Sequence, residues 1–286
     1  MLRDALSNLK AVLTESGKPV AERTVPRPSL FDLFMPGVRE ENLPVPITSK
    51  GEVDQFFTQV AAAPKQAPVG HRGRLIFAMD ATSSREPSWD RACHIQGQMF
   101  EATASLGELD IQLVYFRGLY ETKTSSWCDN GKDLLRQMTE VRCLAGPTQI
   151  GRLLAHAIKE TKREKINAVV FIGDCVEEHV GRLSTLAGEL GLLGVPVFMF
   201  HELDSDPEAS KATAVFETIA KITGGAYCPF NVASAQTLKE LLSAIAVYAV
   251  GGWEALAEYD SRRGGMVSAL LLSDQRNLSP PLSTLR

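Results

Sequence analysis

The sequence predicts an α/β protein with a doubly wound, mostly parallel central sheet, helices on both of its faces and one short antiparallel edge strand. Two observations predict this class. Short runs that are apolar throughout recur along the chain, as expected for strands that are buried on both faces. Segments with apolar residues at helical spacing separate these runs, so strand and helix signals alternate from Arg74 onward.

The first part of this pattern contains two strands with a helix between them. The apolar run 75–79 ends in Asp80 and predicts the first strand. A helix follows, because apolar residues recur at helical spacing from Ala92 to Leu106. The run 111–116 predicts the next strand.

A less regular region comes next. Residues 122–127 are typical of a short edge strand, and residues 134–138 of a short helix. Apolar residues at helical spacing then predict a longer helix over residues 148–160, with Thr148 at its start.

The second half of the chain repeats the alternation. The apolar run 168–172 ends in Gly173 and Asp174 and predicts another buried strand. The remaining predicted elements are, in chain order, a helix, a strand, a helix, a short strand and a helix, over residues 179–192, 195–200, 212–223, 226–228 and 235–250.

The chain is predicted to have three parts, and proline content marks the boundary between the first two. Eight of the 15 prolines lie in the first 70 residues. Residues 1–73 are therefore predicted to form a proline-rich N-terminal extension with short helices, residues 74–250 the main domain, and residues 251–286 a C-terminal tail.

Two helices are expected in the extension. Helical spacing predicts one over residues 2–15, and the capping-box pair Ser49 and Glu52 predicts another just before Val53. The apolar residues at 30–35 are expected to pack on the main domain, with a docking peptide for a partner as the alternative.

Composition excludes several classes of protein. Thirty basic and 34 acidic residues give a net charge of −4, which argues against a broad basic surface for nucleic acid. The five cysteines are odd in number, so neither a disulfide framework nor a zinc cluster is expected. Reduced thiols favour a cytoplasmic location. Neither a secretory signal nor a membrane-spanning stretch is expected.

Hard oxygen donors gather where the predicted strands end. Asp80 and Asp174 each end an apolar strand, Thr82 and Ser84 follow Asp80 at alternating positions, and Thr148 lies at the start of a helix. Two carboxylates and three hydroxyls suit Mg²⁺ or Mn²⁺ rather than a soft metal. Because only two carboxylates face the ion, it would keep an open position for an external oxygen ligand.

The order of these motifs resembles the von Willebrand factor type A (VWA) domain and its metal-ion-dependent adhesion site (MIDAS). The pattern D-x-[ST]-x-S spans residues 80–84, G-x-T spans residues 146–148, and the last aspartate is Asp174. The resemblance covers residues 74–250 and implies a Rossmann-like fold in an intracellular member of bacterial type.

The resemblance also implies a role for each oxygen ligand. Ser84 and Thr148 would bind the metal directly, and Thr82 directly or nearly so. Asp80 and Asp174 would hold it largely through water or hydrogen bonds.

Two positions depart from the pattern of the family. Thr82 stands where the family usually has serine, which keeps the hydroxyl but tightens the loop. Cys175 stands where glycine is common, which puts the local backbone turn in question.

The predicted function is an intracellular, metal-dependent protein-interaction module rather than an enzyme. The metal would take a carboxylate from an Asp or Glu of a protein partner. The resemblance implies an AAA-type ATPase or another chaperone-like machine as partner. No nucleic acid and no membrane are expected.

Other interpretations use the same residues. The alternatives are a metal-dependent hydrolase or phosphotransferase at this rim, a scaffold with a vestigial metal site, and hydroxyls that only cap helices and turns. The interpretation of Cys175 as a nucleophile with His179 as its base is less favoured than that of a partly buried thiol beside an exposed histidine. The other histidines, His201 among them, show no metal spacing and are expected to be packed or exposed.

Overall fold

The computed structural model describes residues 48–64, 72–83, 89, 92–93, 97–103, 108–203, 209–231 and 234–261. All of them belong to one unit, Glu41–Arg286. The helix predicted over 2–15 and the apolar segment 30–35 lie outside the described residues, and so does Ser84 of the candidate site.

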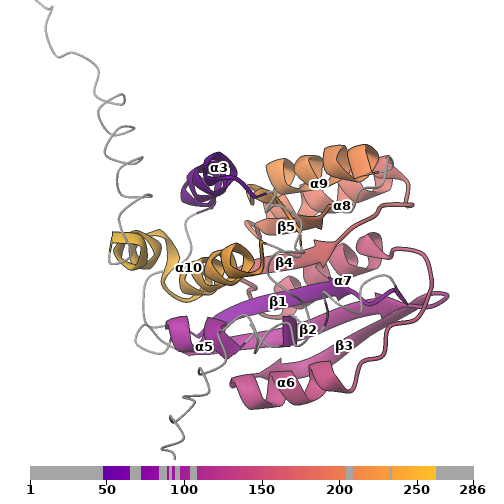
Figure 1. Cartoon of the computed structure of the whole chain (residues 1–286), viewed down its shortest axis with the longest axis horizontal. Coiled ribbons are helices and arrows are strands. Elements are labelled where there is room, and N and C mark those ends of the chain that lie inside the picture. The colour runs from indigo at the N-terminus through magenta and orange to yellow at the C-terminus, as the bar shows by residue number, and fades with distance from the viewer. Residues whose placement is uncertain are drawn as a thin grey trace, which may run out of the picture. The chain divides into compact units, whose positions relative to one another are not determined.

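A six-stranded sheet forms the centre of this unit, in the order β3-β2-β1-β4-β5-β6 (Figure 1). Every neighbouring pair is parallel except β2 and β3, which are antiparallel. The predicted fold class is therefore confirmed. The strands are β1 (Gly73–Asp80), β2 (Leu109–Arg117), β3 (Glu121–Cys128), β4 (Ala168–Gly173), β5 (Val197–Glu202) and β6 (Tyr227–Phe230).

The helices of the described residues agree with the predicted ones in order and type. They are α3 (Lys50–Ala61), α5 (Gly97–Thr103), α6 (Gly131–Thr139), α7 (Ile150–Arg163), α8 (Val180–Leu192), α9 (Ala209–Thr223) and α10 (Ala235–Ser261). Several boundaries shift by a few residues, and those of α7 and α10 bear on the argument. Helix α7 begins two residues after Thr148, and α10 continues past residue 250 to Ser261, with non-helical backbone at Gly252.

The helices cover both faces of the sheet (Figure 1). Ile76 and Ala78 of β1 lie in one core with buried residues of α7, α8 and α9. On the other face, Phe198 of β5 contacts Tyr248 of α10 and Phe56 of α3. Because β1 is buried on both faces along its whole length, the residue at its end lies at the edge of a closed core.

Helix α3 covers the edge strand β6. Its capping box is confirmed, because Ser49 Oγ accepts from Glu52 N and Ser49 N donates to Glu52 Oε2. The Gln59 side chain accepts from the main-chain N of Tyr227 at 3.1 Å, and Thr48 just before the helix donates to a β6 carbonyl. These contacts satisfy backbone groups that an open sheet edge would expose.

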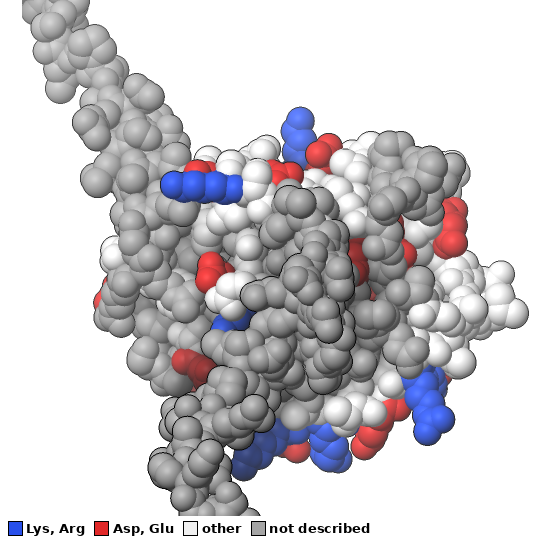
Figure 2. All heavy atoms as spheres, in the orientation of Figure 1, with Lys and Arg blue, Asp and Glu red and all other residues white. Residues whose placement is uncertain are grey.

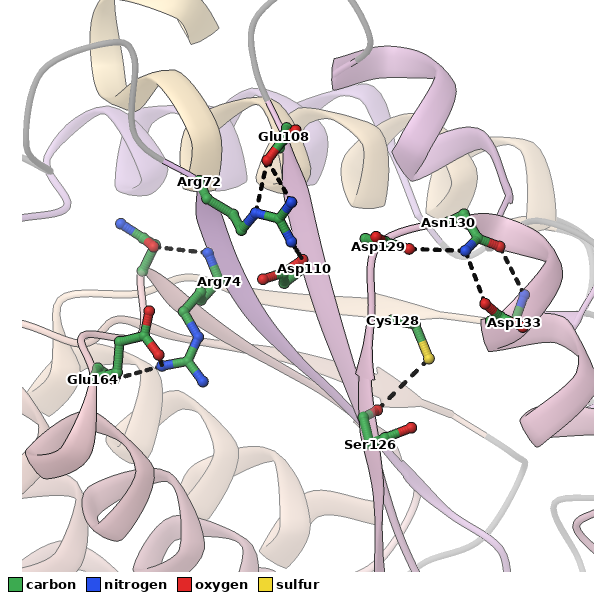
Figure 3. Close-up of polar contacts among 11 residues, drawn as sticks. Arg72, Arg74, Glu108, Asp110, Ser126, Cys128, Asp129, Asn130, Asp133 and Glu164 are labelled. Atoms are coloured by element: carbon green, nitrogen blue, oxygen red, sulfur yellow. Dashed lines mark hydrogen bonds and ion pairs between the residues drawn. The ribbon is translucent and has the colours of Figure 1, made fainter.

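Ion pairs close the amino-terminal end of the sheet (Figure 3). Arg74 at the start of β1 is buried, stacks on the Trp127 ring at 4.0 Å and donates to the main-chain oxygen of Glu164 at 2.9 Å. Arg72 pairs with both Glu108 and Asp110. Charged groups at this end are therefore matched with one another, and Asp80 lies at the opposite end of the same strand.

Two further observations concern the helices and the cysteines. No helix among the described residues combines the length and the apolar character needed to cross a membrane. The five cysteines are all free, and three of them are buried.

Candidate functional site

The strand order brings the two predicted aspartates to one edge of the sheet. β1 and β4 are neighbours, and their register pairs Met79 with Ile172, so Asp80 lies beside Gly173. A Cβ atom on Gly173 would lie 3.6 Å from Asp80 Cβ and 2.6 Å from Cζ of Phe171. A side chain at this position would collide with the Phe171 ring, and Asp174 follows the glycine directly.

The loop after β1 is organised by the Asp80 side chain. Its Oδ1 accepts from Thr82 N at 2.8 Å. Aspartate side chains commonly stabilise a turn through a bond of this kind. Ala81 N donates to the Phe116 carbonyl of β2 at 3.0 Å and holds the loop to the sheet. Asp80 and Thr82 are only 2% and 8% exposed, so their oxygens lie at a nearly closed edge.

Thr148 is tied to the loop that follows Asp174. Its N–H donates to Glu177 Oε2 at 2.6 Å, and its hydroxyl accepts from Glu177 N at 3.2 Å. The hydroxyl does not cap α7, whose N-cap residue is Gln149. A hydroxyl oxygen has two lone pairs, so the one that does not face Glu177 N is suited to a cation.

A second acidic residue fixes the start of α7. The Glu178 carboxylate accepts from the backbone N–H groups of Ile150 and Gly151, the latter at 2.9 Å. Burial raises the pKa of the Glu178 carboxyl, and the two N–H groups oppose this increase. Glu177 and Glu178 therefore join the loop after β4 to the loop before α7, a role that sequence reasoning missed.

The turn between β2 and β3 packs against the same loops. Leu144 N donates to the Ala81 carbonyl at 3.0 Å, and Gly118 N donates to the Leu144 carbonyl at 3.1 Å. A Cβ atom on Gly146 would lie 2.1 Å from the carbonyl oxygen of Gly118. The glycine of the G-x-T motif is thus required by a backbone-to-backbone contact.

Cys175 has a thiol that is poorly suited to nucleophilic attack. Burial raises its pKa, and the negative charges of Glu177, Asp174 and Asp80 raise it further. A protonated thiol is a weak nucleophile, so the raised pKa argues against a nucleophilic role for Cys175.

The candidate ligands suit a hard cation. They combine hydroxyl oxygens with two carboxylates and do not form a dense acidic cluster. In the described part of the chain, no three His, Cys, Asp or Glu side chains form a group that could hold a metal ion. The structure does bring Asp80, Thr82, Thr148 and Asp174 to the same edge, on loops joined by hydrogen bonds. Carboxylate and hydroxyl oxygens are the ligands that Mg²⁺ and Mn²⁺ prefer.

A separate cavity of about 590 Å³ lies away from these residues. It is formed between α3, α9 and β6, and its lining includes Gln59, Glu217, Lys221 and Tyr227. Of the predicted site residues that the structure describes, none lines it.

Comparisons with known proteins find similarity in structure but not in sequence. No family model and no curated protein matches the chain. One similar structure is a mutant of the PilB minor pilin from Streptococcus sanguinis (11% identity, TM-score 0.49, 62% of this chain and 61% of that one). Another is a von Willebrand factor type A protein from Catenulispora acidiphila (11% identity, TM-score 0.47, 67% of this chain and 48% of that one).

A third similar structure is proximal thread matrix protein 1 from the mussel byssus, with a zinc-occupied MIDAS motif (15% identity, TM-score 0.47, 62% of this chain and 46% of that one). The chain spans less than two thirds of the length of each of these three proteins. The likeness concerns the arrangement of strands and helices alone.

Proposed function

We propose that this protein is a VWA-type interaction module that binds an acidic residue of a protein partner through a divalent cation. The cation is Mg²⁺ or Mn²⁺, held by Asp80, Thr82, Ser84, Thr148 and Asp174. One observation carries the proposal: β1 and β4 lie side by side and bring Asp80 and Asp174 to the edge where the Thr148 loop is fastened.

Hydrogen bonds that orient two of the proposed ligands support this site. Asp80 is buried and oriented by Thr82 N, and Thr148 is oriented by Glu177. When bound, the cation supplies a coordination position that prefers an anionic oxygen from outside the chain. The proposed ligands lie at the carboxyl edge of the sheet, which is where ligands bind in such folds.

Exposed apolar side chains beside the site support a protein as the partner. Leu119 and Tyr120 at the β2–β3 turn are 78% and 69% exposed, and Leu144 is 47% exposed. Tyr120 has a φ of 65°, which is uncommon for an aromatic residue, and Arg152 holds its carbonyl at 2.6 Å. Figure 2 shows uncharged atoms projecting at the right-hand edge, where Figure 1 draws this turn. Tyrosine and arginine are enriched among the residues that dominate protein interfaces.

The proposal also covers the cell compartment, the partner and the choice between binding and catalysis. The free cysteines suit a reducing compartment, and we propose the cytoplasm. The proposed partner is an AAA-type ATPase or a chaperone-like machine that presents an Asp or Glu. We propose binding rather than catalysis at this edge.

Calorimetric titration of the full chain with Mg²⁺ tests the metal site. The wild type is expected to bind Mg²⁺, and Asp174→Asn is expected to weaken binding by at least about tenfold, because the carboxylate orients and balances the ion. Asp129→Asn is the matched control, since Asp129 is exposed near the other end of the sheet, beside the start of α6.

Affinity capture then tests the partner. A protein retained in Mg²⁺, released by EDTA and not retained by Asp174→Asn supports the proposal. Capture that EDTA and the substitution leave unchanged contradicts it. Mg²⁺-dependent hydrolysis of p-nitrophenyl phosphate that Asp174→Asn abolishes would instead indicate an enzyme, and wild type without Mg²⁺ binding would indicate a vestigial site.

Substitution of the exposed turn separates docking from metal binding. Leu119→Ser with Tyr120→Asn is expected to leave the Mg²⁺ affinity within about twofold, because neither side chain is a metal ligand. The same variant is expected to lose about tenfold or more in affinity for the captured partner, in line with interface tyrosines. Biolayer interferometry measures the loss, and an unchanged affinity would remove this turn from the interface.

A further inference from the structure

A histidine is fully buried at the end of β5, next to the candidate site. His201 is 0% exposed, and the β4–β5 register pairs it with Gly173. That pair is the last of the ladder, so the chain leaves the sheet at Asp174. The imidazole therefore lies where the main chain of Asp174 begins its loop.

The hydrogen bonds of His201 define the state of its ring. Nε2 lies 3.0 Å from the carbonyl oxygen of Asp174. A carbonyl oxygen only accepts, so Nε2 carries the proton. Nδ1 lies within hydrogen-bond distance of two hydroxyls, Tyr227 Oη at 3.1 Å and Thr213 Oγ1 at 3.3 Å. The Asp174 carbonyl thus requires a proton on Nε2, while β6 and α9 supply hydroxyl partners for Nδ1.

Packing holds the ring in this orientation. The Phe216 ring meets it nearly edge-on at a centroid distance of 4.9 Å, and the Tyr227 ring lies at 6.1 Å. The residues before it on β5, from Val197 to Phe200, are all apolar. A polar ring in this setting is costly unless both nitrogens are bonded, so packing alone does not account for histidine here.

We propose that His201 is a positioning residue for Asp174. By fixing the carbonyl of Asp174, it sets the peptide unit from which the carboxylate projects toward the candidate cation. This inference rests on the proposed function, because it assigns His201 a role in the same metal site. Groups behind a metal ligand commonly change metal affinity by 10- to 100-fold when they are removed.

The test is calorimetric titration with Mg²⁺ alone, using the full chain. His201→Phe removes the donor and is expected to weaken Mg²⁺ binding about tenfold or more. His201→Gln keeps an N–H near the Nε2 position and is expected to remain within about threefold of wild type. The control is Phe198→Leu, on the same strand but packed against α3 and α10, which is expected to lower stability without changing Mg²⁺ affinity.

The outcomes separate the two proposals. Wild-type binding that Asp174→Asn weakens, with His201→Phe equal to wild type, overturns the role of His201 and leaves the metal site standing. A loss of affinity in Phe198→Leu equal to that in His201→Phe also overturns it. A wild type that does not bind Mg²⁺ overturns both.

A measurement on the wild-type chain covers the case in which His201→Phe does not fold. Long-range ¹H–¹⁵N NMR correlations of the imidazole report which nitrogen carries the proton. The expected result is a ring that carries a proton on Nε2. A neutral ring protonated at Nδ1 alone would have no donor for the Asp174 carbonyl and would overturn the proposal.

Discussion

Gly146→Ala is expected to lower the free energy of unfolding by roughly 1–3 kcal/mol and to weaken Mg²⁺ binding in the same protein. The added Cβ would lie 2.1 Å from the Gly118 carbonyl oxygen and 2.4 Å from its carbon. Both contacts are with backbone atoms, so no side-chain rotation relieves them. Either the β2–β3 turn or the loop before α7 has to move.

The effect on metal binding follows from how this loop is held. Thr148 is two residues from Gly146, and its hydroxyl is placed by a 3.2 Å bond from Glu177 N. Displacing the loop is expected to stretch that bond and misplace the hydroxyl, which costs about tenfold in affinity for a ligand of this kind. Urea denaturation and Mg²⁺ titration measure the two losses.

Gly188→Ala is the matched control, because a Cβ atom there meets nothing within 4 Å. Gly188 lies inside α8, where alanine is favoured over glycine by about 0.8–1 kcal/mol, so this variant is expected to be more stable than wild type with unchanged Mg²⁺ affinity. A Gly146→Ala protein as stable as wild type would contradict the described contact with the turn.

The strands could be predicted from sequence because burial on both faces leaves little freedom in residue type. The runs 75–79 and 168–172, which lie in β1 and β4, are apolar throughout, and every residue of both strands is buried. The helices could be predicted from the helical spacing of their apolar residues. The order of the strands was not predicted, because alternation fixes the fold class but not which strands are neighbours. It is the adjacency of β1 and β4 that brings Asp80 close to Asp174.

The partners of the candidate site could not be predicted, because each comes from a distant part of the chain. Glu177 reaches Thr148 across 29 positions, and His201 reaches Asp174 across 27. The start of α7 was predicted two residues early for the same reason. The hydroxyl of Thr148 looks like a cap in the local sequence, but Glu177 N donates to it and Glu178 accepts from the first N–H groups of the helix.

Phe171→Ala is expected to lower the free energy of unfolding by about 3–5 kcal/mol, as for a large aromatic ring removed from a closed core. Phe171 is fully buried in the middle of the sheet, stacked on Phe116 at 5.9 Å and edge-on to Phe216 at 5.5 Å. Phe216 in turn packs on His201, so the cavity would also loosen the support of the candidate site. Leu192→Ala, at a side chain that is 92% exposed, is expected to change stability by less than about 0.5 kcal/mol.

A double-mutant cycle with Gly173 tests whether this ring is what requires glycine before Asp174. Gly173→Ala alone is expected to be destabilising, because its Cβ would lie 2.6 Å from Cζ of Phe171 and only at ordinary contact distance, 3.6 Å, from Asp80 Cβ. In the Phe171→Ala background that collision is gone, so Gly173→Ala is expected to cost at least about 1 kcal/mol less, measured by urea denaturation. Strictly additive losses would mean that the backbone at the end of β4, and not the ring beneath it, excludes a side chain next to the candidate site.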